Sequence, residues 1–192
     1  MNMFIDREQS ICRSVSGPRI GHVNLRVADL IRATSFYCDV LGLSVSYYGP
    51  SIRVPTVFLT FGDYHHHLAL NWFYCDSDQS RHLNLGGLNH VAIVHPDEVS
   101  LARVVTRLME YGDLIDDARD HGWTLSVYLR DPDGNGIELY YDRPQAQWFD
   151  SVGELVIKSE PFDVRKWLND LRAATTKSAL DKTRIRSLEV TI

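Results

Sequence analysis

Two copies of one short pattern decide the fold: residues 21–29 read GHVNLRVAD, and residues 89–97 read NHVAIVHPD. Each copy places a histidine, His22 or His90, at the start of an alternating apolar run that ends in an aspartate. The two histidines are 68 residues apart, which is too long for a solenoid repeat and too short for two independent domains. The sequence therefore predicts two similar modules within one folded unit.

A helical pattern follows each copy, and strand-like segments follow each helix. Asp29, and either Asp97 or Ser100, are the expected N-caps, while Gly42 and Gly112 stand where the helices should end. Each module then has the order β-α-β-β-β. The predicted fold class is α+β, with two tandem βαβββ modules forming one curved mixed sheet. The expected helices are 30–41 and 99–109, and the expected strands that follow them are 43–48, 54–61, 65–71, 114–116, 124–130 and 137–141.

These elements divide the chain into five parts. The C-terminal part carries a weak strand pattern at 154–158 and a helical pattern at 164–174, and becomes polar and basic from Thr175 on. The expected parts are an N-terminal tail (1–17), module 1 (18–74), a linker rich in Asp, Ser, Asn and Gly (75–86), module 2 (87–144) and a C-terminal extension (145–192).

Composition excludes several classes of protein. With 44% hydrophobic and 23% charged residues the chain is globular rather than disordered. The net charge of −5 and the lack of a basic cluster argue against a nucleic-acid partner. Apolar runs of at most four residues argue against a membrane span. The chain has three cysteines but no C-x-x-C pair, and its start lacks the apolar stretch of a secretory signal. Both features predict a cytoplasmic protein.

Strand alternation predicts which side chains converge. His22 and His90 should point away from the apolar faces that pack under the helices. The turn DPDGNG at 131–136 joins two strands into a hairpin, and a register that pairs Tyr128 with Glu138 puts both on one face. A set of two imidazoles and one carboxylate is typical of a site for a divalent metal, above all for non-haem Fe(II). Such a set leaves other coordination positions of the ion open, and Fe(II) chemistry uses them. The competing interpretation is that the histidines are structural and the glutamate is solvated, but the repeat favours the metal.

The run HHHLALN at 65–71 is the other unusual feature. In a strand, His65 and His67 would face one way and His66 the other. The functional interpretation is an acid/base group or a fourth metal ligand, because this strand is the module 1 counterpart of the Glu138 strand. The alternative is a partly exposed polar strand end. His121, taken alone, is interpreted as a loop histidine.

At these residues the sequence resembles the vicinal-oxygen-chelate superfamily, which includes glyoxalases, bleomycin resistance proteins and extradiol dioxygenases. Within it, the chain is similar to small single-domain bacterial catechol 2,3-dioxygenases. The segments that carry the resemblance are IGHVNLRVADL (20–30), YHHHLALNWF (64–73), LNHVAIV (88–94) and DHGWTLSVYLRDPDGNGIELYYDRP (120–144).

The resemblance implies that His22, His90 and Glu138 bind Fe(II), with Mn(II) as an alternative ion. It also implies an acid/base histidine from the HHH run, with His121 and Tyr128 near the substrate. Strand parity favours His67 as the counterpart of Glu138, whereas alignment through the following apolar residues favours His66, and both remain open.

The function expected on these grounds is an Fe(II)-dependent extradiol dioxygenase that inserts O₂ beside the diol of a catechol-type aromatic compound, in the degradation of such compounds. One alternative is a glyoxalase-like isomerase or thiol transferase, for which His67 would be a fourth ligand. Another is a non-catalytic binder of small molecules with the same fold. Trp- and Tyr-rich segments near the sheet edge favour a homodimer.

Overall fold

The computed structural model describes residues 19–50, 54–73 and 87–189, so the expected tail and linker lie outside the described residues. Its elements are β1 (Val23–Val27), α1 (Leu30–Ser35), η1 (Phe36–Val40), β2 (Ser44–Pro50), β3 (Pro55–Thr60), β4 (Leu68–Trp72), β5 (Val91–His95), α2 (Glu98–Tyr111), β6 (Ile115–Asp120), β7 (Thr124–Arg130), β8 (Gly136–Asp142), η2 (Gln145–Gln147), β9 (Glu160–Pro161) and α3 (Val164–Glu189).

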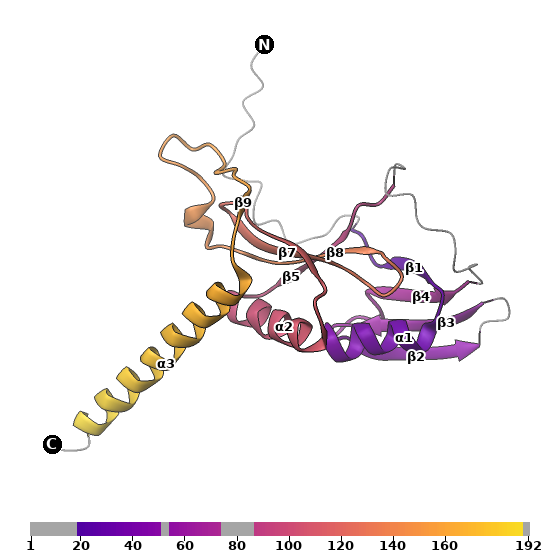
Figure 1. Cartoon of the computed structure of the whole chain (residues 1–192), viewed down its shortest axis with the longest axis horizontal. Coiled ribbons are helices and arrows are strands. Elements are labelled where there is room, and N and C mark those ends of the chain that lie inside the picture. Colours follow the sequence, from indigo (N-terminus) through magenta and orange to yellow (C-terminus); the bar gives the residue numbers. More distant parts are fainter. Residues whose placement is uncertain (1–18, 51–53, 74–86, 190–192) are drawn as a thin grey trace, which may run out of the picture.

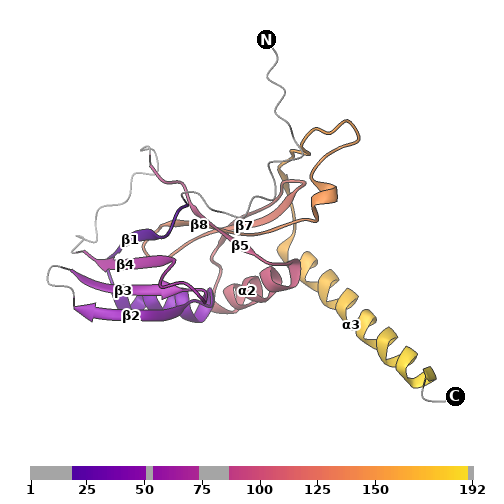
Figure 2. The same cartoon turned by 180° about the vertical axis from the view of Figure 1, so that it is seen from behind.

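The α+β class and the β-α-β-β-β order of each module are confirmed. The strands divide into two hydrogen-bonded sheets, ordered β1-β4-β3-β2 and β5-β8-β7-β6-β9, instead of the expected single curved sheet. In each sheet the first strand pairs in parallel with the fourth, and the other pairs are antiparallel. The difference lies at β1 and β5, which are edge strands of their own sheets and do not pair with each other; side chains of both line a groove instead. Figures 1 and 2 show the two sheets from opposite sides.

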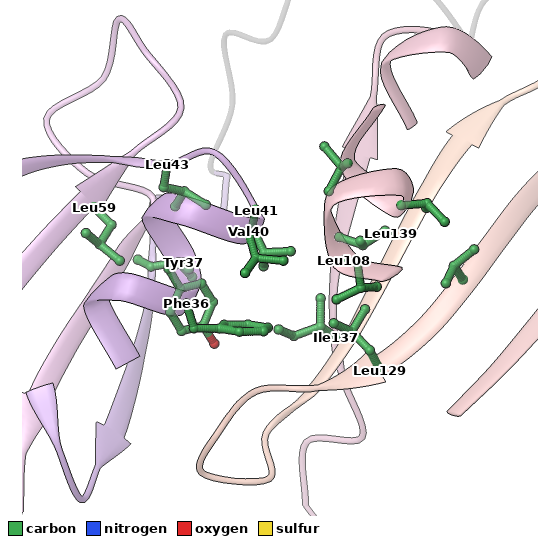
Figure 3. Packing of buried hydrophobic residues seen from close by; sticks show 14 of the residues in the cluster. Phe36, Tyr37, Val40, Leu41, Leu43, Leu59, Leu108, Leu129, Ile137 and Leu139 are labelled. Carbon is green, nitrogen blue, oxygen red and sulfur yellow. The ribbon is translucent and has the colours of Figure 1, made fainter. Parts of the chain in front are cut away.

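One hydrophobic core joins the modules instead of a shared ladder. Phe36 from η1 points toward Ile137 from β8, with Leu108 from α2 beside it (Figure 3). All three side chains are at most 2% exposed. Each such burial contributes about 1.5–3 kcal/mol to the free energy of unfolding, so this contact stabilises the modules against each other.

Both helices begin at the expected aspartates. Asp29 Oδ1 accepts hydrogen bonds from the backbone N–H groups of Ile31 and Arg32. Asp97, rather than Ser100, caps α2 by accepting from the Ser100 N–H. The first helix continues as the π-helical turn η1. Gly42, with a φ of +84°, follows it in a left-handed conformation that suits glycine.

The prediction of a strand over 65–71 is wrong for its three histidines. The β3–β4 ladder ends at the pair Leu59–Leu68, and His65–His67 lie in the loop before it. Thr60 closes this loop, because its hydroxyl contacts the carbonyl oxygens of Gly62 (3.0 Å) and Tyr64 (2.7 Å). His67 still has strand-like backbone bonds, because its N–H donates to the Leu59 carbonyl and its own carbonyl accepts the Val23 N–H, so the alternation is lost at His65 and His66.

Two strand predictions in the second module and the extension differ from the structure. The weak strand at 114–116 is longer and forms β6. No strand forms at 154–158 beyond an isolated bridge between Phe149 and Leu155, because the Val156 and Lys158 N–H groups donate to scattered carbonyls, those of Trp148 and His121.

The C-terminal helix is also longer than expected. α3 continues past residue 174 to Glu189 and projects from the body of the molecule (Figure 1). Leu168 is buried and Trp167 packs beside it, which anchors the first turns of the helix to the core. In the part of the chain that the structure describes, no helix combines the length and apolar character needed to cross a membrane.

Candidate functional site: two half-sites on either side of a groove

The module 2 half-site centres on His90 and Glu138. β5 and β8 are parallel neighbours with Ala92 opposite Glu138, so the histidine that precedes β5 lies beside the glutamate. His90 Nε2 and Glu138 Oε2 are 3.0 Å apart, and their side chains are 31% and 14% exposed. The other ring nitrogen, Nδ1, lies 3.3 Å from the Asn89 side-chain amide. This arrangement directs Nε2 at the carboxylate.

A hydrogen-bonded chain continues from this glutamate. The predicted pairing of Tyr128 with Glu138 is confirmed, and the tyrosine O–H donates to Glu138 Oε1 at 2.8 Å. His121 Nε2 is 2.9 Å from the same tyrosine oxygen, and His121 Nδ1 is 3.2 Å from the Lys158 carbonyl oxygen. Because the Lys158 carbonyl oxygen can only accept, His121 Nδ1 is the ring nitrogen that donates to it, and Nε2 lies against the tyrosine oxygen. The C-terminal extension thus orients His121 toward the site.

The position of Tyr128 beside Glu138 also affects the pKa of the tyrosine. Burial, together with the hydrogen bond and negative charge of Glu138, raises the pKa of Tyr128 to about 12. Since the phenolate would lie next to a carboxylate in a partly desolvated place, the protonated form is favoured. Tyr128 therefore remains a hydrogen-bond donor at neutral pH.

The module 1 half-site consists of His22, His65, His66 and Phe58. The rings of His22 and His66 have centroids 4.4 Å apart, and His66 stacks on Phe58 at 4.2 Å with an interplanar angle of 13°. His65 Nδ1 lies 2.5 Å from His66 Nδ1. Desolvation, followed by the neighbouring histidines, lowers the pKa of His66. A neutral imidazole can accept a proton, so His66 has the character of a base.

His67 lines the groove together with His22 and His90, and its Nδ1 is held by the loop between β3 and β4. Its Nδ1 accepts the Phe61 backbone N–H at 3.2 Å and lies 3.1 Å from the Thr60 hydroxyl. Through these contacts the loop between β3 and β4 orients the His67 ring. The two alternatives thus lie differently: the ring of His66 contacts that of His22, whereas His67 lines the groove that His22 and His90 also line.

Register also corrects the expected counterpart of Glu138. Glu138 lies opposite Ala92 of β5 and Tyr128 of β7. The corresponding place in module 1, opposite Asn24 of β1 and Phe58 of β3, is occupied by Ala69, which is neither His66 nor His67. The duplication therefore keeps the two histidines, but module 1 has an apolar Phe58–Ala69 pair where module 2 has Tyr128–Glu138.

Each half-site contributes one histidine to a groove between the modules. The volume of the groove is about 800 Å³, and it is lined by His22, His67 and His90, together with Val23 and Val91–Ile93 from the strand edges. Most of the lining surface is apolar. Such a lining with a few polar groups is typical of small-molecule sites.

The donor set fits a divalent metal in part. Two ligands bound at right angles, each about 2.1 Å from a metal, are roughly 3.0 Å apart, and His90 Nε2 and Glu138 Oε2 have this separation. Within the described residues, however, no three His, Cys, Asp or Glu side chains are close enough together to hold an ion. The ring of His22 lies against that of His66. A metal site of His22, His90 and Glu138 would need the three side chains to come closer together than they are here.

Three contributors to this arrangement are absent from the sequence prediction. Phe58 stacks on His66, and the Lys158 carbonyl orients His121. Gly136 lets β8 approach the backbone of Asn89. Only Gly136 carried a visible signal, as part of the DPDGNG turn; the contacts of the other two depend on tertiary structure.

Comparison with known proteins places the chain among relatives of this architecture. The family model described as "Glyoxalase/Bleomycin resistance protein/Dioxygenase superfamily" matches residues 19–139. "Catechol-2,3-dioxygenase" of Bacillus subtilis is 32% identical over 79% of this chain and 51% of its own length. "Biphenyl-2,3-diol 1,2-dioxygenase 3" of Rhodococcus globerulus is 34% identical over 65% of this chain and 64% of its own length. The chain thus spans only about half to two thirds of these curated relatives.

Solved structures support the fold. A glyoxylase/bleomycin resistance protein/dioxygenase domain from Frankia sp. EAN1pec has a TM-score of 0.60, covering 68% of this chain and 96% of that one at 18% identity. This likeness concerns the fold alone. Together with the family match over more than half of the chain, it leads to one conclusion: the protein belongs to the glyoxalase/bleomycin resistance protein/dioxygenase superfamily.

Proposed function

We propose that this chain is an Fe(II)-dependent extradiol dioxygenase that acts on a catechol-type ring, with His22, His90 and Glu138 as the metal ligands. The observation that carries the proposal is the asymmetry between the modules. A site with four protein ligands, as an isomerase of this superfamily would use, calls for a donor in both modules at the Glu138 position. Module 1 has Ala69 there, and His67 is engaged by Thr60 and Phe61.

Two histidines and one carboxylate leave coordination positions open, which is what a chelating diol and O₂ require. Fe(II), when bound, would supply the Lewis acidity and the redox chemistry for ring cleavage. In the overall reaction both atoms of O₂ enter the product and the ring C–C bond beside the diol breaks, which gives a muconic semialdehyde. No external reductant is needed, because the ring supplies the electrons.

The side chains of this protein have separate tasks in the proposal. His66, a neutral imidazole beside His22, accepts a proton from the diol as it binds. Tyr128 keeps its proton and, when the diol binds, exchanges its hydrogen bond to Glu138 for one to a substrate oxygen, while His121 holds the tyrosine in place. The apolar strand edges of the groove exclude water from the ring.

The test is O₂ uptake by protein loaded anaerobically with Fe(II) and given a panel of substituted catechols. We expect uptake matched by a yellow ring-fission product. Glu138→Ala should abolish uptake, whereas Glu110→Ala, the same substitution at an exposed site on α2, should leave it unchanged.

Two outcomes would contradict the proposal. Equal turnover in wild type and Glu138→Ala would remove the glutamate from the site. Bound iron without uptake, together with isomerisation of a hemithioacetal, would favour the isomerase instead.

A further inference from the structure

The turn between β7 and β8 reaches across to module 1. Asp133, at the tip of this turn, has a side chain that is only 8% exposed. Its Oδ1 accepts the backbone N–H of Ala28 at 3.0 Å and lies 3.1 Å from Arg32 Nη2. Ala28 directly follows β1, the strand that His22 precedes. One carboxylate oxygen of module 2 thus holds the C-terminal end of β1, and His22 lies at the N-terminal end of the same strand.

A second aspartate makes the turn rigid. Asp131, which is 4% exposed, accepts the N–H groups of Asp133 (2.9 Å) and Asn135 (2.7 Å) through Oδ1. Its Oδ2 accepts the Tyr37 O–H from η1 of module 1 at 2.9 Å. The tip that presents Asp133 is therefore fixed from inside the turn and from the facing module.

The other end of the turn touches the second histidine. At Gly136, a Cβ atom would lie 3.2 Å from His90 Cα. Glu138 follows two residues later in the same strand. A single turn thus contacts the ends of both strands that carry proposed histidine ligands, and leads directly into the proposed carboxylate ligand.

We infer that Asp133 is a positioning residue that sets the distance of His22 from His90 and Glu138. This rests on the proposed function, because His22, His90 and Glu138 are taken as the metal ligands. From His22 to Ala28 the strand is roughly 20 Å long. If Ala28 were released, a rotation of about 10° around the middle of the strand, which the interior core holds, would displace His22 by roughly 2 Å. Metal ligands must lie within about 0.2 Å of their bonding distance, so even a smaller rotation weakens binding.

The experiment is a double-mutant cycle read by Co(II) affinity in calorimetric titration of the apoprotein. Asp133→Ala should weaken Co(II) binding by about 10- to 100-fold, the range found when residues supporting a ligand are removed. Asp133→Asn should restore most of the affinity, because it keeps Oδ1, and Oδ2 has no partner among the described residues. Asp113→Ala, an exposed aspartate, controls for the loss of charge.

The decisive comparison is made in a His22→Ala background. If Asp133 acts through His22, Asp133→Ala causes no further loss there. Equal losses in both backgrounds mean that Asp133 only stabilises the fold, and overturn the inference. If Asp133→Ala does not fold, Arg32→Ala, which removes one of the two partners of Oδ1, enters the same cycle with a smaller expected loss.

A second readout separates this inference from the proposed function. The Ala28 amide should be protected from hydrogen exchange in wild type and in Asp133→Asn, and lose protection in Asp133→Ala. An unprotected Ala28 amide in wild type refutes the contact regardless of the metal. Wild type that does not bind Co(II), but protects Ala28, refutes both the ligand set and the positioning role, and leaves the contact as a structural one.

Discussion

Replacing Gly136 with alanine should damage both stability and the His90–Glu138 pair. The added Cβ would lie 2.1 Å from the Asn89 carbonyl oxygen, which is a backbone atom and cannot rotate away. An ordinary C···O contact is about 3.3 Å, so β8 and the Asn89 backbone must separate by roughly 1.2 Å. Crowding of this kind typically costs about 1–3 kcal/mol in the free energy of unfolding. For a protein of this size the melting temperature should fall by roughly 2–12 °C.

The separation moves His90 away from Glu138, whose present Nε2–Oε2 distance of 3.0 Å suits two ligands of one ion. Co(II) affinity should therefore fall by about 10-fold or more. Gly87→Ala is the matched control, since a Cβ there meets nothing within 4 Å. Thermal unfolding and calorimetric titration of both variants decide the matter. If Gly136→Ala melts and binds Co(II) like Gly87→Ala, the close approach of β8 to Asn89 does not exist in solution.

Two further predictions concern individual side chains of the site. The unfolded phenol of Tyr128 titrates near 10.0 and the folded one near 12, so its contribution to stability is present below pH 10 and lost as the pH rises toward 12. Tyr128→Phe should flatten this part of the decline in urea denaturation between pH 9 and 12; an unchanged slope would contradict the raised pKa. His66→Ala should reduce turnover by about 10²- to 10⁴-fold with little change in melting temperature. His67→Ala should instead cost about 1 kcal/mol of stability, because the hydrogen bonds of its ring with Thr60 and Phe61 can no longer form. This variant should largely retain turnover. The opposite pattern in the two variants would reverse the roles of His66 and His67.

Much of the fold could be predicted from the sequence, because its signals are local. The repeated His-to-Asp pattern marks β1 and β5, and the aspartate that ends each copy caps the next helix through hydrogen bonds to neighbours two or three residues away. The DPDGNG turn determines the β7–β8 register, and with it the pairing of Tyr128 with Glu138. Alternation and capping act within a few residues, so a single sequence is enough to detect them.

The histidine run shows where prediction from local pattern fails. Strand parity favoured His67 as the counterpart of Glu138, but the register gives that place to Ala69, and a loop closed by the Thr60 hydroxyl holds His65 and His66 outside the strand. Once the alternation is broken, only three-dimensional packing decides that His66 lies against His22 and Phe58.

The sequence by itself determined the two modules, their helices and most of their strands, and the set of candidate ligands. Only the tertiary structure decided how the modules face each other: two sheets across a groove, Ala69 opposite Asn24 where a fourth donor could stand, and Asp133 bonded to Ala28. The reason is physical. Contacts within a module depend on the spacing of residues along the chain, whereas contacts between modules depend on the packing of side chains that lie about a hundred positions apart and carry no shared local signal.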